Sequence, residues 1–290
     1  MSLKRGRVDL HTHTRHSDGL DTPAELVRKC ARQGVRRLAV TDHDTLAALP
    51  EAFAAGETHG VEVFTGIELS VQHEAFQDIH LLGYFFDPQD ASLNTCLQRL
   101  QEGRTQRGLE ILRRVNVRLG DLGLPPLAED CVRQHAAGVV TRPHLAQALV
   151  DQGCSRDHQE AFRDFLIPCN APKPSLPLGE GIRLVVQAGG VCSLAHPGIL
   201  SNDPNVLDPL LAAAKSLGLA GLEVYHRAQF PNDIPFFEAT ARRHGLVATG
   251  GSDYHGRSNG PKLGELAPDH PVPVAVVDNL RRVADCRKSQ

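Results

Sequence analysis

Three of the larger side chains are scarce in this 290-residue chain, which has no tryptophan, one methionine and three tyrosines. Its core must therefore be built mainly from aliphatic side chains. No apolar run approaches the roughly 18–20 residues of a membrane span, and the N-terminus lacks the apolar stretch of a signal peptide. The net charge of -3 does not indicate a strongly basic surface for nucleic acid. We therefore expect a cytoplasmic protein with no membrane association and no obligate protein partner.

The cysteines give no indication of a metal site, whereas the histidines do. The seven cysteines are scattered and form no C-x-x-C pair, so they predict neither a disulfide framework nor a thiolate zinc site. Histidine is abundant, with 15 residues in the chain. Metal ligation is the usual cause of such an excess. The length allows one barrel-sized α/β domain or two smaller domains.

Seven short apolar runs are typical of strands buried on both faces, because they are continuous rather than alternating. They are Val8–His13, Leu38–His43, Val61–Glu68, Ile79–Tyr84, Val191–His196, Leu222–His226 and Leu246–His255. Helices are expected after a capping box at Thr22, after a cap at Asp44 or Thr45, and over Asn205–Gly218 and Asp233–Gly245. The alternation predicts a parallel barrel or a doubly wound sheet.

The alternation is interrupted between about residues 92 and 178. Three helical patterns occupy this stretch, over Leu93–Leu119, Arg142–Val150 and Arg156–Leu166. A proline-rich segment, 168–174, leads back to the strands. We interpret the stretch as a helical insertion between two strands.

Histidine, aspartate or glutamate stands at nearly every predicted strand end. The carboxyl ends of parallel strands meet on one face of a barrel, where such folds keep their active sites. On a strand, His11 and His13 project to the same side with Cβ atoms roughly 6–7 Å apart, and Asp253 and His255 repeat this spacing. Either pair alone is compatible with ordinary packing. Burying so many ionisable groups without a partner would cost several kcal/mol each, so the pattern predicts a metal cluster.

On these residues the sequence resembles the PHP (polymerase and histidinol phosphatase) family of the amidohydrolase superfamily. The matching segments are Asp9–His13, Ser17–Gly19, Thr41–Asp44, Gly66–Glu68, His80, Ala195–Pro197 and Gly251–His255. The resemblance implies a distorted seven-stranded (β/α)7 barrel made by residues 1–91 and 179–290, with residues 92–178 as a helical insertion that caps the substrate. It also implies two or three divalent ions. Nitrogen and oxygen ligands without thiolate favour Mn²⁺, with Zn²⁺ or Fe²⁺ as alternatives.

The resemblance also implies a set of ligands. His11, His13 and Asp253 would hold one ion, Glu68 would bridge it to a second held by His80 and His196, and Asp18, His43 and His255 would hold the third. His16 is the alternative to Asp18. Asp42 is assigned a catalytic role, orienting His43 or His13 from behind. The expected mechanism is in-line attack of a metal-bound hydroxide on phosphorus, without a covalent intermediate.

Further matches at residues 17–23, 80–84, 141–146 and 223–226 resemble one PHP branch, the stand-alone nucleotide phosphatases and short-RNA 5′→3′ exonucleases. The resemblance implies a phosphoric ester hydrolase that removes the 3′-phosphate of 3′,5′-nucleoside bisphosphates, giving 5′-monophosphates, or trims short oligoribonucleotides from the 5′ end. Two alternatives remain open. One is a phosphatase for a small metabolite such as histidinol phosphate, and the other is a non-catalytic metal-binding regulatory module.

Basic residues of the insertion are the candidate substrate contacts. Arg104 and Arg107 border the apolar face of the first helix, although such a stripe is equally typical of a solvated helix face. Arg142 begins a helix whose free amides favour phosphate. His144 and Lys173 complete this set. Outside it, His226 is a candidate substrate contact and proton donor to the leaving oxygen, with a structural role as the alternative.

Overall fold

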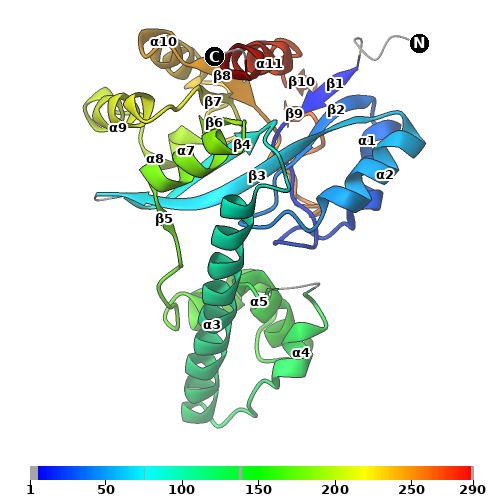
Figure 1. The fold of residues 1–290 in the computed structure, drawn as a ribbon. Helices are drawn as coiled ribbons and strands as arrows, with labels where there is room; N and C mark the ends of the chain where they lie inside the picture. Colours follow the sequence, from blue (N-terminus) through cyan, green and yellow to red (C-terminus); the bar gives the residue numbers. More distant parts are fainter. Residues whose placement is uncertain (1–5, 75, 137–138, 289–290) are drawn as a thin grey trace.

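The protein is described by a computed structural model that covers residues 6–74, 76–136 and 139–288. A central sheet has the strand order β1-β2-β3-β4-β6-β7-β8, with β5 paired to β3 (Figure 1). The strands are β1 (Arg7–Asp9), β2 (Val35–Val40), β3 (Glu62–His73), β4 (Phe76–Tyr84), β5 (Leu176–Pro177), β6 (Val191–Leu194), β7 (Gly221–Tyr225) and β8 (Val247–Gly250). Each of the seven predicted apolar runs overlaps one strand of this order, and β5 was not predicted.

The direction of one strand differs from the prediction of a parallel sheet. β4 runs antiparallel to both of its neighbours, β3 and β6, whereas the other neighbours in the order are parallel. β3 and β4 follow each other directly in sequence, and a short connection of this kind can join only antiparallel strands. Two predicted ligands, Glu68 and His80, therefore lie within these long strands and not at strand ends.

The two ends of the strand order meet beyond β1 and β8. Thr12 forms a parallel bridge with Tyr254, and the Asp253 amide donates to the carbonyl of His11. A Cβ atom on Gly251 would lie 2.4 Å from the backbone nitrogen of His11, so only glycine allows this approach. The buried carboxylate of Asp9 accepts hydrogen bonds from Ser252 and fixes the same junction. The segments that carry His11 and Asp253 are thereby held side by side.

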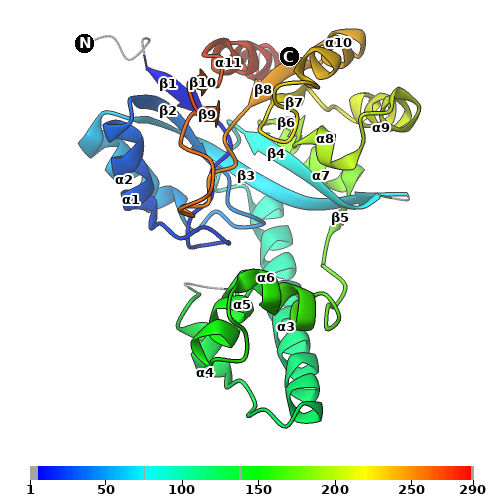
Figure 2. The ribbon, with the colours of Figure 1, turned by 180° about the vertical axis from the view of Figure 1, so that it is seen from behind.

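Helices pack around the sheet, as both views show (Figures 1 and 2). They are α1 (Pro23–Arg32), α2 (Leu49–His59), α7 (Leu178–Gln187), α8 (Pro197–Leu200), α9 (Pro204–Ser216), α10 (Ile234–Arg243) and α11 (Ala275–Lys288). The predicted capping box of α1 is confirmed, since the Thr22 hydroxyl accepts from the Glu25 amide. A cap contributes about 1 kcal/mol. β9 (Glu265–Ala267) and β10 (His270–Pro271) form a separate antiparallel pair.

The predicted cap of α2 at Asp44 or Thr45 is wrong. This helix begins at Leu49 and has no side-chain cap. Asp44 instead has a left-handed backbone, with φ 54°, and its carboxylate accepts from the Ser70 amide and the Arg104 guanidinium. A carboxylate used in these contacts is not available to the amides of a helix.

The stretch between β4 and β5 is helical, as predicted. Its elements are α3 (Ala91–Asp121), α4 (Glu129–Arg133), α5 (Arg142–Asp151), α6 (His158–Ala161) and a π-helix, η2 (Phe162–Leu166). α3 extends away from the sheet and carries the others at its far end (Figures 1 and 2). Its first half, through Leu93 and Leu100, packs in the core of the sheet, and its second half, through Ile111 and Leu119, packs in a separate cluster. No helix in the described ranges is both long and apolar enough to cross a bilayer.

Candidate metal centre

Nine side chains of metal-ligating type converge at the junction of the strand ends. Within the described residues, four overlapping groups hold ligand atoms within 4.8 Å of one another, and together they comprise His11, His13, Asp18, His43, Glu68, His80, His196, Asp253 and His255. These are the nine residues that the sequence singles out. His11 and His13 follow β1, His43 follows β2, and Asp253 and His255 follow β8. Segments far apart in sequence thus supply one cluster.

Glu68 lies at the middle of this cluster and is 1% exposed. Each of its carboxylate oxygens faces several imidazole nitrogens. The distances to Oε2 are 3.2 Å from His11 Nε2, 3.2 Å from His13 Nε2 and 3.1 Å from His43 Nδ1, and those to Oε1 are 2.8 Å from His80 Nδ1 and 3.2 Å from His196 Nε2. A carboxylate with rings on both oxygens has the arrangement of a bridging ligand.

Asp253 and Asp18 extend the cluster on either side of His13. Asp253 Oδ1 lies 3.2 Å from His13 Nε2 and 3.5 Å from His11 Nε2. Asp18 Oδ1 lies 3.2 Å from His255 Nε2, 3.8 Å from His13 Nδ1 and 3.9 Å from His43 Nε2. His16, the alternative to Asp18, belongs to none of the four groups within the described ranges. The geometry therefore favours Asp18.

The donor atoms at the centre lack hydrogen-bond partners. His11 Nε2, His13 Nε2, His43 Nδ1 and Glu68 Oε2 are buried, and none has a partner among the described residues. Leaving a buried polar atom unpaired costs about 1–3 kcal/mol, and here several of them point at one another. Divalent cations would satisfy them together. The set is imidazole and carboxylate without thiolate, which fits Mn²⁺, Zn²⁺ or Fe²⁺.

The carboxylates of the cluster are held in the anionic form. Burial alone would raise the pKa of Glu68, but its interactions with the surrounding imidazoles, those with His43 and His80 being the largest, outweigh burial and leave the pKa well below its usual range. The pKa of Asp253 is lowered against burial in the same way, mainly by His11. Anionic oxygens are the form that ligates cations.

Two of the nine residues have unusual backbone angles. His196 has φ 27° and Asp253 has φ 56°, in the left-handed region that side chains other than glycine rarely adopt. Such conformations cost of order 1–3 kcal/mol and concentrate at functional sites. At both positions the backbone is turned so that the side chain enters the cluster.

Glu223 is a residue of the site to which the sequence analysis assigned no role. It is fully buried in β7; its Oε1 lies 3.0 Å from His11 Nδ1, and its Oε2 accepts from the His196 amide at 2.7 Å. A carboxylate on the far nitrogen of a ligating imidazole fixes the ring and its tautomer. The available signal was a single acidic residue inside the apolar run from Leu219 to Val224.

Asp42 has a different role from the one expected. It accepts hydrogen bonds from the amide and hydroxyl of Thr14 and from the Ser17 hydroxyl, rather than from the ring of His43 or His13. Ser17 Oγ in turn lies 3.5 Å from His13 Nδ1. Asp42 therefore fixes the loop between His13 and Asp18, and it acts on His13 only through Ser17.

Comparison with known proteins identifies the family. The PHP domain family matches residues 9–118. A 3′,5′-nucleoside bisphosphate phosphatase from Chromobacterium violaceum is 32% identical over 257 residues, which cover 87% of this chain and 88% of that protein. The chain belongs to the PHP family. A 5′-3′ exoribonuclease from Haemophilus influenzae is 32% identical over 255 residues, covering 86% of this chain and 90% of that protein.

A solved structure agrees with the family assignment. It is a protein from Bifidobacterium adolescentis assigned as a metal-dependent phosphoesterase, and it superposes with a TM-score of 0.81 at 32% identity. The superposition covers 98% of this chain and 96% of that one. The likeness therefore includes the helices between β4 and β5 as well as the PHP sheet.

A cavity of about 390 Å³ opens beside this PHP metal centre. Its lining joins the loop of His16 and Ser17, His43, the α3 residues from Gln98 to Thr105, and Thr141 before α5. Arg104 lines it, but its guanidinium donates to Asp44 and to Ser70. The positive charge of Arg104 is therefore already paired within the protein.

Two other predicted substrate contacts, Lys173 and His144, are bound to residues of the protein itself. Lys173 Nζ lies 2.8 Å from His80 Nε2 and also donates to Asp78. The other ring nitrogen of His80, Nδ1, faces Glu68. His144 Nδ1 accepts from the Thr141 amide and caps α5. Both side chains thus hold parts of the site in place.

The remaining two arginines, Arg107 and Arg142, contact other residues of the stretch between β4 and β5. Arg107 donates to the Ala171 carbonyl and the Asn170 side chain, and Arg142 lies over the ring of Phe162, 5.7 Å from its centre. Burial, followed by the positive charges of Arg142 and Arg104, lowers the pKa of Arg107 to about 10. Arg107 is therefore close enough to Arg142 and Arg104 to be repelled by both.

Proposed function

We propose that this PHP protein is a metal-dependent hydrolase that removes the 3′-phosphate from 3′,5′-nucleoside bisphosphates and leaves the 5′-monophosphate. Trimming of short RNA from the 5′ end is the same reaction on a longer substrate, because the bond from phosphorus to the 3′-oxygen breaks in both. The observation that carries the proposal is the buried Glu68 carboxylate, with five imidazoles around it and a cavity alongside. The two nucleotide-acting relatives support the choice of substrate.

The proposed ligand sets follow the sequence prediction. His11, His13 and Asp253 would hold one ion, Glu68 would join it to a second ion held by His80 and His196, and Asp18, His43 and His255 would hold a third. Mn²⁺ is the metal we propose, with Zn²⁺ and Fe²⁺ as the alternatives that fit the same donors. Bound ions would lower the pKa of water and neutralise charge on the phosphoryl group.

His226 is our candidate for the contact with the leaving oxygen and for its protonation. Its Nδ1 accepts from the Ala228 amide at 3.1 Å, so the neutral ring carries its hydrogen on Nε2. That Nε2 is buried without a hydrogen-bond partner among the described residues, and it lies 3.6 Å from Asp253 Oδ2. We assign this Nε2–H a hydrogen bond to the leaving 3′-oxygen, which stabilises the charge on that oxygen and supports its protonation. Asp42 contributes by holding the loop of Asp18.

The helices over residues 92–178 are proposed to form a cap that reads the rest of the substrate. They contain a hydrophobic cluster separate from that of the sheet. Arg107 and Arg142 repel each other through their positive charges, and a second phosphate between them would relieve that repulsion. We also propose that residues 1–91 and 179–290 form a closed, distorted barrel, which the bridge between Thr12 and Tyr254 supports.

The test is hydrolysis of a substrate panel by Mn²⁺-loaded protein. The panel contains 3′,5′-bisphosphoadenosine, AMP, histidinol phosphate and a short 5′-phosphorylated RNA, and products are separated by chromatography. We expect the bisphosphate to give AMP and phosphate, with little turnover of AMP or histidinol phosphate. Preferred hydrolysis of histidinol phosphate would show that the substrate is a small metabolite and not a nucleotide. If no ester in the panel is hydrolysed, the proposal that the protein is a phosphoric ester hydrolase is wrong.

A further inference from the structure

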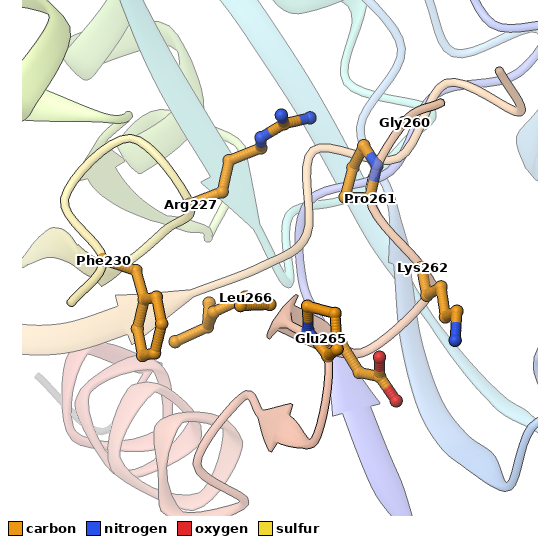
Figure 3. Close-up of a pocket in the computed structure, with 9 residues that line it drawn as sticks. Arg227, Phe230, Gly260, Pro261, Lys262, Glu265 and Leu266 are labelled. Carbon is orange, nitrogen blue, oxygen red and sulfur yellow. The ribbon is translucent and has the colours of Figure 1, made fainter. Parts of the chain in front are cut away.

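A second cavity, of about 360 Å³, lies between the loop that follows β7 and the loop that follows β8. Figure 3 shows Arg227 projecting from the first loop toward Gly260 and Pro261 of the second. The lining is completed by Phe230, Lys262, Glu265, Leu266, Ala267 and Pro268. It shares no residue with the cavity beside α3. None of its lining residues has a role in the proposed removal of a 3′-phosphate.

Both walls of this cavity follow residues of the metal site in the sequence. Arg227 is the residue after His226, whose ring lies against Asp253. The other wall begins after His255, a member of the ligand cluster, and reaches Lys262 seven residues later. The two loops that line the cavity are therefore the same two loops that carry His226 and His255.

The cavity carries positive charge that the protein does not neutralise. Arg227 and Lys262 are exposed, and neither side chain has a hydrogen-bond or ion-pair partner within the described residues. The acid of the lining, Glu265, is paired with Arg7. Two cations without a partner thus line one cavity, which favours an anion such as a phosphodiester.

An aromatic surface lies beside these cations. The ring of Phe230 is half-buried, stands 4.6 Å from the ring of His270, and packs against the cluster that contains Leu266. Stacking of bases on aromatic rings beside a basic groove is how proteins hold single-stranded nucleic acid without reading its sequence. A simple phosphate ester or a bisphosphate has no second base to place there.

We infer that this cavity binds the second nucleotide of a short RNA, with its base on Phe230 and its phosphates at Arg227 and Lys262. The inference rests on the proposed function, because the first nucleotide must present its 3′-phosphodiester to the metal centre. Water adds its oxygen to phosphorus, the bond to the 3′-oxygen of the first nucleotide breaks, and that oxygen takes a proton. The first nucleotide is released as a 5′-monophosphate, and the phosphate stays on the second nucleotide as its 5′-phosphate, which the cavity holds through the reaction.

The experiment compares Arg227→Ala/Lys262→Ala with wild type on 3′,5′-bisphosphoadenosine and on a 5′-phosphorylated triribonucleotide. We expect kcat/KM for the RNA to fall about tenfold or more, and that for the bisphosphate to stay within about twofold. Phe230→Leu keeps an apolar side chain without a ring and should lower only the RNA value, also about tenfold. Arg227→Lys/Lys262→Arg should restore it. Arg183→Ala/Lys215→Ala, which removes equal charge elsewhere, should leave both values unchanged.

A binding measurement separates this inference from the proposed function. Anisotropy of a 3′-labelled pentaribonucleotide in EDTA should show weaker binding by the Arg227/Lys262 double variant, and the slope of log Kd against log salt should fall by about 0.7 for each cation removed. If wild type hydrolyses no substrate but shows this dependence, the reaction is wrong and the cavity stands. Suppose that the bisphosphate is hydrolysed but that the variants change neither kcat/KM for the RNA nor the binding of RNA. In that case, or if kcat/KM falls equally for both substrates, the assignment of the cavity is wrong.

Discussion

Replacing Glu68 with glutamine is expected to reduce hydrolysis of 3′,5′-bisphosphoadenosine by about a thousandfold or more in metal-loaded protein. The side chain faces five imidazoles from both of its oxygens, and an amide supplies neither the charge nor two equivalent oxygens to cations between them. Loss of several kcal/mol of charge stabilisation in the transition state corresponds to this factor. Steady-state kinetics with added Mn²⁺ measure it.

The matched control is Glu62→Gln on the same strand. Glu62 pairs with Arg281 away from the cluster, so the control should retain nearly full activity. Circular dichroism and thermal melting should show both variants folded. Wild-type turnover by folded Glu68→Gln protein would contradict the assignment of Glu68 as a metal ligand.

Replacing Glu223 with glutamine is expected to weaken Mn²⁺ binding by about 10–100-fold. Glu223 contacts the nitrogen of His11 that faces away from the cluster, and it also accepts from the amide of His196. An amide of the same size keeps the packing but removes the charge that supports a ligating imidazole. Competition of the protein with a fluorescent chelator measures the change directly, without reference to turnover.

A conservative change elsewhere shows whether the effect is specific. Glu238→Gln alters a carboxylate of α10 that accepts from Tyr225 at the end of β7, and it should leave Mn²⁺ affinity unchanged. At saturating Mn²⁺, the Glu223 variant should recover much of its activity because its catalytic groups are intact. Metal affinity equal to that of wild type would mean that Glu223 has only a packing role.

The sequence was sufficient for features that depend on local patterns. Continuous apolar runs marked the regions of the buried strands, and the capping box at Thr22 marked the start of α1. The pairs His11/His13 and Asp253/His255 showed that ligand-type side chains gather, because this requires only that the strands share one sheet. The long helix over Leu93–Leu119 was also recognisable from its periodicity, within two residues of each end of α3.

What depends on distant contacts could not be predicted. The direction of β4 is set by its pairing with β3 and β6, and polar residues such as Ser70 made β3 appear to end at Glu68. The local sequence around Asp44 resembles a helix cap, but in the structure its carboxylate pairs with Arg104, 60 residues later. Glu223 lies 212 residues from His11, and no sequence spacing indicates which imidazole a buried carboxylate will meet.

The most direct test of the central claim is reconstitution of metal-free protein. Protein stripped by a chelator should not hydrolyse 3′,5′-bisphosphoadenosine, and titration with Mn²⁺ should restore AMP production with saturation at two or three ions per chain, measured by elemental analysis. Full activity in protein shown to contain no divalent metal would contradict the account.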